Sequence, residues 1–507
     1  MENYTPVKSA LISLFHKEPA RELIHLLGKS GVKIYSTGGT LNFIRDLGYE
    51  ATAVEDMTSY PSVFGGRVKT LHPKIFGGIL FRRQNESDQA EQEKYQIPAI
   101  DMVLVDLYPF EETVAKGGSE EEIIEKIDIG GISLIRAGAK NFAHTWVVAS
   151  QDMYDEAREL IARQGLQTTV DQRKHFAANA FHVSSHYDTA IFEHISGGSK
   201  EVFKKSISKG KKLRYGENPH QEGYFFGDME KIFTQLHGKE LSYNNLLDVD
   251  AAISLMGEFS EPTFVIIKHT NACGVASRLD IKQAYLDALA SDPVSAFGGI
   301  LIANRNIDHD TAYHINELFF EVILAPDYSE EALNVLKQRK NRIILQLNEQ
   351  VTQKWVFRSA LNGVLAQSGN LTDTRPQDLI LATVTSPEEA VKEDLVFANK
   401  IVKHTKSNAI VLAANRQLLA SGTGQTSRVD ALKQAIVKAK EFKHNLKGAV
   451  MASDAFFPFP DCVEIASKEG IISVIQPGGS VRDNESIDFC NEHGISMVMT
   501  STRHFKH

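Results

Sequence analysis

Short apolar runs alternate with helical segments along roughly the first two hundred residues, and this alternation constrains the fold more than any other feature. The runs Lys33–Ser36, Met102–Tyr108 and Trp146–Ser150 are typical of buried strands. Helical patterns lie around them at Leu41–Asp46, Glu120–Ile127 and Tyr154–Arg163. Strands that alternate with helices form a parallel sheet with helices on its faces. The sequence therefore predicts an α/β domain with a parallel sheet at the start of the chain.

The clearest linker of the chain is Ser196-Gly197-Gly198-Ser199, which ends a long helical pattern that starts at Val170. Glycine and serine make a segment flexible, so we place the main boundary there. The first domain is predicted at residues 1–196 and the second at 200–507, with a subdivision near 365. The second region also has an α/β pattern, with apolar runs at 264–268, 300–303, 322–325, 409–414, 449–453, 471–475 and 497–500. No repeat of fixed period is evident.

The composition excludes several classes of protein. A chain of 507 residues with 42% apolar residues is long enough for several domains. No run approaches the roughly 20 apolar residues of a membrane span, and the N-terminus lacks the pattern of a secretory signal. A net charge of −9 without a long basic block argues against nucleic acid as a partner. We expect a cytoplasmic protein that holds any anionic ligand by a local basic cluster.

The three cysteines, Cys273, Cys462 and Cys490, lie far apart and form no CxxC pair. A disulfide framework, a structural zinc site and a zinc-dependent deaminase are therefore not expected, and no metal site is predicted. Cys273 is either a small packing residue or a nucleophile. Packing is favoured, because the sequence shows no activating group beyond His269.

Two glycine-containing segments of the first domain are candidates for anion binding. Ser36-Thr37-Gly38-Gly39-Thr40 follows a predicted strand and opens a helix, where free backbone N–H groups bind phosphate, although the same residues also make ordinary helix caps. In the segment Gly65–Pro73, Arg67 and Lys69 are two residues apart and point the same way if the chain is extended. Together the two segments predict an anion site.

Three further polar residues of the first domain follow or open predicted elements. Tyr108 ends a strand in Leu107-Tyr108-Pro109-Phe110, Asp128 precedes Ile129-Gly130-Gly131, and Lys140 ends the run from Arg136. Each alone is compatible with a structural role. Together they offer a phenol, a carboxylate and a cation for proton transfer and for stabilising an oxyanion.

In the second region, the stretch Phe264–Gly274 reads FVIIKHTNACG. Its apolar part predicts a buried strand, and its Asn- and Gly-containing part predicts the turn that leaves the strand. Lys268 and His269 then lie at the end of a strand, where α/β proteins commonly form their sites. Both can serve one site only if the backbone turns there. A catalytic pair and a core-capping histidine beside a solvated lysine both fit this pattern.

The motifs STGGT, GGRVKTLHP, LYPF, IDIGG and RAGAKN resemble, in order and spacing, the cyclohydrolase domain of the bifunctional purine biosynthesis family. The resemblance implies a methylglyoxal-synthase-like fold that closes a formylated intermediate to inosine monophosphate. It implies that the catalytic residues around the closing ring are Lys69, Tyr108, Asp128 and Lys140. It implies that phosphate and ribose are bound by Lys17, Ser36, Thr37, Gly38, Gly39, Thr40, Arg67 and Thr70.

The first domain departs from the family pattern at two places. The family usually reads Ser-Asp-Lys-Thr-Gly after the first strand, whereas this chain reads Phe15-His16-Lys17-Glu18-Pro19. Lys17 aligns, but Phe15 replaces a serine that donates to phosphate. Asp106 stands where the family commonly has Asn, and a carboxylate does not donate as an amide does unless it is protonated.

The second region resembles the transformylase domain of the same family through RYGENPHQ, LSYNNL, KHTNACG and the tail STRHFKH. The resemblance implies two cytidine-deaminase-like α/β subdomains, 10-formyltetrahydrofolate as co-substrate, and a homodimer with its sites at the subunit interface. His269 would take a proton from the attacking amine, and Lys268 would stabilise charge on the formyl oxygen. Implied ribonucleotide contacts are Arg214, Tyr215, Asn245, Asn408, Arg428 and Arg503. Implied folate contacts are Phe456, Phe457 and Pro458.

The sequence thus predicts a bifunctional enzyme that transfers a formyl group to 5-aminoimidazole-4-carboxamide ribonucleotide and then closes the ring with loss of water. The substrates are phosphorylated small molecules and folate, with no nucleic-acid or membrane partner. Ala272, where the family has proline, leaves open how the KHTNACG turn is shaped. Two alternatives remain: a monofunctional transformylase with a degenerate first domain, and a non-catalytic nucleotide sensor.

Overall fold

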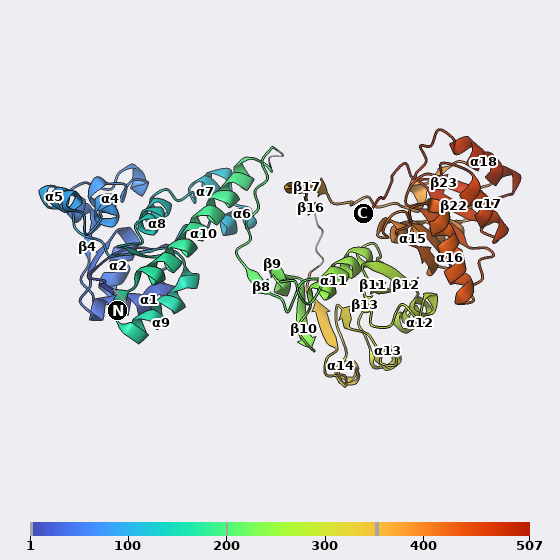
Figure 1. Cartoon of the computed structure of the whole chain (residues 1–507), viewed down its shortest axis with the longest axis horizontal. Helices are drawn as coiled ribbons and strands as arrows, with labels where there is room; N and C mark the ends of the chain where they lie inside the picture. Colours follow the sequence, from blue (N-terminus) through green and yellow to red (C-terminus); the bar gives the residue numbers. More distant parts are fainter. Residues whose placement is uncertain (1–3, 199–200, 350–353) are drawn as a thin grey trace. The chain divides into compact units, whose positions relative to one another are not determined.

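The computed structural model describes residues 4–198, 201–349 and 354–507. The chain forms two compact units, Met1–Ser208 and Lys209–His507, which are coloured blue to green and green to red in Figure 1. The predicted linker precedes this boundary, and its last residue, Ser199, lies outside the described residues together with Lys200.

The first unit is built on a parallel sheet that has five strands among its described residues, in the order β4-β3-β2-β5-β6. The strands are β2 (Ser9–Ser13), β3 (Lys33–Ser36), β4 (Thr52–Ala53), β5 (Met102–Val105) and β6 (Trp146–Val148). Both faces are covered, so β5 is buried throughout and reads as a continuous apolar run. The predicted parallel sheet is confirmed. The strand predicted to reach Tyr108 is wrong at its end, because it stops at Val105 and leaves Asp106 and Tyr108 in the following loop.

Helices pack on both faces of this sheet (Figure 1). Their bounds are α1 (Arg21–Lys29), α2 (Gly38–Asp46), α3 (Val54–Thr58), α4 (Pro73–Leu80), α5 (Glu86–Lys94), α6 (Phe110–Ala115), α7 (Glu120–Ile124), α8 (Gly130–Lys140), α9 (Tyr154–Gln164) and α10 (Val170–Ile195). The long helix α10 packs against α8 and β6, where Trp146 and Phe176 meet edge to face with ring centroids 5.4 Å apart. A short ladder joins β1 (Thr5–Pro6) to β7 (Gln167–Thr168).

The second unit contains a sheet with twelve strands among its described residues, in the order β10-β15-β14-β13-β11-β12-β20-β19-β21-β22-β23-β18. The strands are β10 (Phe233–His237), β11 (Thr263–Lys268), β12 (Asn271–Ser277), β13 (Ile300–Ala303), β14 (Val322–Ala325), β15 (Ile343–Leu347), β18 (Ile380–Leu381), β19 (Ile410–Ala414), β20 (Gln417–Gly422), β21 (Val450–Ser453), β22 (Ser473–Gln476) and β23 (Ser496–Met499). The helices are α11 (Tyr243–Met256), α12 (Ile281–Ser291), α13 (His309–Ile315), α14 (Glu330–Leu336), α15 (Glu389–Lys403), α16 (Arg428–Glu441), α17 (Asp461–Lys468) and α18 (Asp483–Glu492).

This sheet has two halves of the same design. In each half a helix, α11 or α15, precedes an antiparallel hairpin, β11–β12 or β19–β20, and three mutually parallel strands complete the half. Both hairpins have a register shift at the equivalent point, between Ile266 and Ile267 and between Leu412 and Ala413. The halves meet where Ala276 of β12 pairs with Gln417 of β20. The two halves agree with the two like subdomains that the resemblance implied, although no repeat of fixed period was evident in the sequence.

Two small hairpins lie outside this sheet. One joins β8 (Gly210–Lys212) to β9 (Tyr224–Phe226), and the other joins β16 (Trp355–Ala360) to β17 (Gly363–Ser368). Residue 365, where we predicted a subdivision, falls inside the second hairpin, whose side chains are almost all exposed.

Candidate active sites

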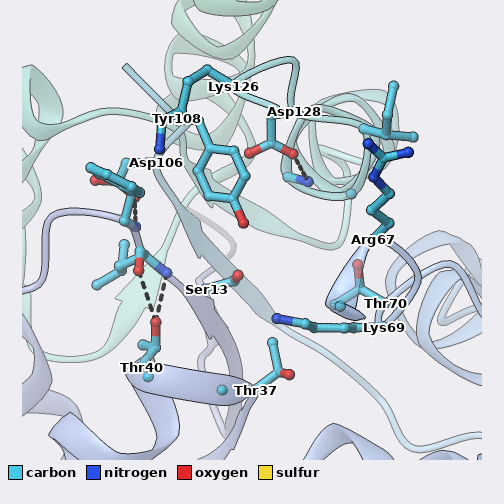
Figure 2. Close-up of a pocket in the computed structure, with 18 of the residues that line it drawn as sticks. Ser13, Thr37, Thr40, Arg67, Lys69, Thr70, Asp106, Tyr108, Lys126 and Asp128 are labelled. Atoms are coloured by element: carbon cyan, nitrogen blue, oxygen red, sulfur yellow. Dashed lines mark hydrogen bonds between the residues drawn. The ribbon is translucent and has the colours of Figure 1, made fainter. Parts of the chain in front are cut away.

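The first unit contains a cavity of about 690 Å³ at the carboxyl-terminal edge of its parallel sheet. Ser13 at the end of β2, Thr37 after β3 and Tyr108 after β5 all line it, as Figure 2 shows. Loops from neighbouring parallel strands meet at this edge, so residues far apart in sequence converge there. Of the predicted residues, the cavity lining includes Lys17, Thr37, Gly38, Gly39, Thr40, Arg67, Lys69, Thr70, Tyr108 and Asp128.

The start of α2 forms a cradle for an anion inside this cavity. Thr37 is the N-cap, and its side chain makes no capping hydrogen bond. A Cβ built at Gly38 would lie 3.6 Å from the ammonium nitrogen of Lys69, and one at Gly39 would lie 3.7 Å from that of Lys17. Two cations therefore flank the backbone N–H groups at a helix N-terminus, an arrangement that binds phosphate.

Ser36 and Thr40 serve the fold at this point. The Ser36 side chain is fully buried, donates to the Ile12 carbonyl oxygen at 2.7 Å and does not line the cavity. The Ser36 side chain therefore does not support the predicted phosphate contact, because its hydroxyl ties β3 to β2. The Thr40 hydroxyl reaches the cavity but accepts from the backbone N–H of Leu14 at 2.9 Å and donates to its carbonyl at 3.0 Å.

Tyr108 and Asp128 lie side by side in the cavity (Figure 2), and the backbone N–H of Tyr108 donates to the Asp128 carboxylate. The Asp128 carboxylate accepts from the backbone N–H of Gly131 at 2.6 Å at the start of α8. Burial raises the pKa of Asp128, and burial together with the Asp128 charge raises the pKa of Tyr108. A phenol and a carboxyl group whose pKa values are both raised can hold and exchange protons close to a bound ring.

Lys140 does not join this cavity. It is the exposed last residue of α8, whereas the cavity touches the first residues of that helix, Gly130 and Gly131. A rise of 1.5 Å per residue separates the two ends of such a helix by about 15 Å. The position of Lys140, at the far end of α8 from the cavity, therefore disagrees with the prediction that Lys140 lies around the closing ring.

The two departures from the family pattern lie in contact. The Asp106 carboxylate accepts from the backbone N–H groups of Phe15 and His16, the latter at 2.9 Å, and lies 3.2 Å from the His16 ring nitrogen Nδ1. The Phe15 ring meets the Tyr108 ring edge to face at 5.4 Å. Asp106 thus holds the segment that carries Lys17, and burial raises the pKa of Asp106. Its role is to accept hydrogen bonds from this loop.

Lys126 is a cavity residue that sequence reasoning missed. Its ammonium nitrogen lies 5.3 Å from the centroid of the Phe15 ring and 5.9 Å from that of Tyr108. The signal in the sequence was a lysine two residues before Asp128. Arg67, by contrast, forms an exposed ion pair with Glu125.

In the second unit, Lys268 and His269 occupy the tip of the hairpin β11–β12. Lys268 pairs with Asn271, so His269 and Thr270 are the two turn residues, with φ angles of 49° and 63°. Two left-handed residues are typical of a type I′ hairpin turn. The prediction that Asn271–Gly274 form the turn is wrong, because these residues belong to β12. The backbone does turn at His269, as one shared site for both side chains requires.

A cavity of about 200 Å³ lies beside this turn and is lined from both halves of the sheet. The Lys268 ammonium donates to the carbonyl oxygens of Phe297 and Gly298, at 3.0 Å each. Cys273 also lines the cavity, and burial raises the pKa of its thiol to about 12. The thiol is therefore protonated at neutral pH, which agrees with packing rather than nucleophilic chemistry.

The aromatic rings of Phe297 and Phe319 beside Lys268 were not predicted. Their centroids are 4.9 Å apart, and the two side chains are 62% and 54% exposed. A Cβ built at Gly298 would lie 3.1 Å from the Lys268 ammonium nitrogen and 3.6 Å from the Phe319 ring. An exposed aromatic pair beside a lysine offers a flat apolar surface for a ligand.

Asn408, Arg428 and Phe456 come together in the second half of the sheet. Arg428 donates to the Asn408 side-chain oxygen and to the fully buried Asp454 carboxylate, at 2.9 Å each, and to the Phe456 carbonyl oxygen at 3.2 Å. Phe456 and Pro458 are exposed. Phe457 is fully buried in the core of this half, so the prediction that its side chain contacts folate is wrong.

The remaining predicted residues lie elsewhere in the second unit. Asn245 is buried, and its side-chain oxygen accepts from the backbone N–H and the hydroxyl of Ser242 in the capping box of α11. Arg214 is exposed and lies over the Tyr215 ring at 5.6 Å. Arg503 is exposed and lies over the Phe505 ring at 4.4 Å. The C-terminal tail is anchored, because Lys506 and Ser407 exchange hydrogen bonds of 2.9 and 3.0 Å.

None of the helices that the structure describes is both long and apolar enough to cross a membrane. No cluster of three or more His, Cys, Asp or Glu residues is arranged to hold a metal ion within the described residues.

Comparisons with known proteins place the chain in a family. A family model described as "AICARFT/IMPCHase bienzyme" matches residues 138–438, and one described as "MGS-like domain" matches residues 19–133. The bifunctional purine biosynthesis protein PurH of Bacteroides thetaiotaomicron is 59% identical over 501 residues, which cover 99% of both chains. That of Aquifex aeolicus is 45% identical over 513 residues, covering 98% of this chain and 100% of the relative.

These matches confirm the methylglyoxal-synthase-like first domain and the resemblance drawn from the motifs. They span both units at identities far above the level at which only the fold is shared. The chain therefore belongs to the bifunctional purine biosynthesis family, the bienzymes that combine 5-aminoimidazole-4-carboxamide ribonucleotide transformylase with inosine monophosphate cyclohydrolase.

Proposed function

We propose that the cavity of the first unit is the cyclohydrolase site. The observation that supports this most is the cradle at the start of α2, with Lys17 and Lys69 beside it, in one cavity with Tyr108 and Asp128. In ring closure the carboxamide nitrogen attacks the formyl carbon, and the formyl oxygen leaves as water. Lys17 and the backbone N–H groups of the cradle hold the phosphate, and Lys69 stabilises the developing oxyanion. Tyr108 and Asp128 relay the protons that nitrogen loses and oxygen gains.

The turn that carries Lys268 and His269 is proposed as the transformylase centre. The amine of the ribonucleotide attacks the formyl carbon of 10-formyltetrahydrofolate, a new C–N bond forms, and the bond to the folate nitrogen breaks. His269 takes the proton that the amine loses and returns it to the folate nitrogen, and Lys268 stabilises the charge on the formyl oxygen. Phe297 and Phe319 beside Lys268, with Phe456 and Pro458 in the other half, supply apolar surface for the folate.

We further propose that a homodimer in the cytoplasm completes this second site. The cavity beside His269 contains neither Arg214, Asn408, Arg428 nor Arg503, although all four are expected to bind the ribonucleotide. The projecting hairpin β16–β17 presents Trp355 and Val364, 44% and 45% exposed, which provides apolar surface for a second copy.

A two-step assay tests these assignments. Lys69→Ala should lower ring closure of the formylated ribonucleotide by about 10²–10⁴-fold and leave formyl transfer unchanged, because positioned catalytic groups contribute about that much. His269→Ala should have the converse effect. Each variant is the control for the other, since both are made in the full chain and one activity reports that the chain has folded. The assignment fails if neither substitution abolishes one step selectively.

A further inference from the structure

The turn that presents His269 is held in an unfavourable backbone conformation. His269 and Thr270 have φ angles of 49° and 63° and are not glycines. Left-handed φ is a clear outlier for a β-branched residue such as threonine. Such residues persist only where surrounding contacts determine their conformation, and they cluster at functional sites.

The contacts that hold this turn come mainly from one carboxylate. Asp248 on α11 accepts from the backbone N–H of Thr270 at 2.7 Å, and the backbone N–H of His269 also donates to it. On the other side, the amide nitrogen of Asn271 donates to the His269 carbonyl oxygen at 2.9 Å. The Asn271 side-chain oxygen accepts from the backbone N–H of Lys406 at 3.0 Å, which ties the turn to the other half of the sheet.

The second half of the sheet contains the same arrangement, a left-handed hairpin turn held by a helix aspartate, but without the catalytic pair. Asn415 and Arg416 form the turn of β19–β20 with φ angles of 52° and 51°. Asp394 on α15 accepts from their backbone N–H groups at 2.8 and 2.6 Å. Asp394, Asn415 and Arg416 follow Asp248, His269 and Thr270 at one constant interval in the sequence.

The two turns differ in what they carry. The second begins with asparagine, which tolerates the left-handed region, and has no β-branched residue. The first carries an imidazole followed by threonine, so it depends more strongly on its carboxylate. A loosened turn at Asn415 disturbs exposed residues whose carbonyl oxygens accept from Ser277 and Arg278 and which belong to neither proposed site. A loosened turn at His269 displaces the imidazole from its substrate.

We propose that Asp248 is a positioning residue for formyl transfer, which acts by fixing the His269–Thr270 turn and thereby the direction of the imidazole. The inference rests on the proposed role of His269. Asp248 touches no reacting atom in this account, because its contacts are the two backbone N–H groups of the turn.

The test compares Asp248→Asn with the matched variant Asp394→Asn in the full chain. Asp248→Asn should lower kcat of formyl transfer about 10–100-fold, since a misplacement of about 1 Å can cost that much, and leave KM for the ribonucleotide within about twofold. Asp394→Asn should leave this kcat within about twofold, even if the midpoint of urea unfolding falls equally in both variants. Ring closure in the first unit should be unchanged in both and reports on folding.

Rescue distinguishes positioning from a general loss of structure. Glycine adopts left-handed φ without a steric cost, so Thr270→Gly added to Asp248→Asn should recover a large part of kcat. The inference is overturned if the two aspartate variants lose kcat equally, if Asp248→Asn leaves it unchanged, or if the glycine brings no recovery. A full rate in His269→Ala would instead overturn the proposed centre itself, so the two failures are distinguishable.

Discussion

The two candidate sites differ in how many of their predicted residues one chain brings together in a single cavity. The cavity of the first unit brings ten predicted residues together, from the loops after β2 and β5, the start of α2, the segment between α3 and α4, and the residues just before α8. The cavity beside His269 contains two, Lys268 and His269. The other predicted residues of the second unit lie in separate places on its two halves and in its tail.

The topology of the two sheets explains this difference. A parallel sheet directs all its carboxyl-terminal loops to one edge, so a site forms there from any set of polar loops. The second sheet is antiparallel at its centre, where β11 pairs with β12 and β12 with β20. A hairpin turn such as His269–Thr270 is not joined at the same edge by the loops of neighbouring strands. The candidate site at this turn therefore needs residues from other surfaces to complete it. The comparison predicts that the second activity depends on assembly and the first does not.

The largest expected effect comes from disrupting that assembly. Val364 lies on the same face of the hairpin β16–β17 as Trp355, because residues directly opposite or two apart share a face. A charge there should separate the proposed dimer, so Val364→Glu is expected to lower formyl transfer more than about 10-fold, as burying an unpaired charge is costly. Ring closure should persist. Sedimentation of the same samples measures the oligomeric state.

Gln367 provides the matched control for this prediction. It is exposed and lies on the opposite face of the hairpin, paired with Val356. Gln367→Glu adds the same charge and should change neither the oligomeric state nor either activity. A monomeric Val364→Glu that keeps full formyl transfer would show that one chain completes the second site by itself.

A smaller effect is expected in the first unit, where Asp106 holds the segment that carries Lys17. Asp106→Asn replaces one of the two carboxylate oxygens by an amide nitrogen, so one of the two backbone N–H groups of Phe15 and His16 loses its acceptor. A hydrogen bond contributes about 1 kcal/mol net, or about fivefold in binding. KM for the formylated ribonucleotide should therefore rise about fivefold while formyl transfer is unchanged. Steady-state kinetics of the two half-reactions measure both.

The family pattern has Asp and Asn where this chain has His16 and Asp106. A double-mutant comparison can therefore test whether these two residues act together in substrate binding. If the two positions act as a pair, His16→Asp combined with Asp106→Asn should lose less than the sum of the single variants. Strict additivity of the two substitutions would show that their contact has no bearing on substrate binding.

Much of this architecture was predictable from local sequence. The strands of the first sheet are apolar runs bounded by polar loops. Gly38 and Gly39 at the start of a helix indicated an anion site only together with the cations of the segment Gly65–Pro73. The turn at His269 was misplaced because Asn271 and Gly274 are strong turn formers, yet here they lie in a strand. The tertiary contact from Asp248 decides the turn and leaves no local trace.

Burial explains the other failures. Ser36 and Phe457 belong to motifs that surround a site, but their side chains point into the core. A motif identifies a segment, whereas the direction of each side chain depends on the packing around it. The two like halves of the second sheet followed from the family resemblance and not from a repeat in the residues, because Asp248 and Asp394 play one structural role in halves whose turn sequences differ.

The prediction with the smallest effect at neutral pH concerns the stability of the second unit, which depends on the protonation of His504 in the C-terminal tail. Burial lowers the pKa of His504 to about 4 from an ordinary value of 6.5. The unfolded chain therefore takes up a proton below pH 6.5 that the folded chain refuses until about pH 4. Stability falls as the pH falls through this window, by up to about 3 kcal/mol at its lower end, and is unaffected at pH 7.

His504→Asn removes this titration and should flatten the dependence of the urea midpoint on pH between 6.5 and 4. The exposed His220 serves as the control, and His220→Asn should leave the dependence unchanged. The neutral His504 ring accepts at Nδ1 from the Asn370 amide nitrogen at 3.1 Å, and a protonated ring loses this contact. Because this ring lies in the tail of the second unit, acid should impair formyl transfer before ring closure. If formyl transfer and ring closure of the unaltered chain declined together as the pH fell, the second site would not be the more acid-sensitive of the two, and this prediction would be contradicted.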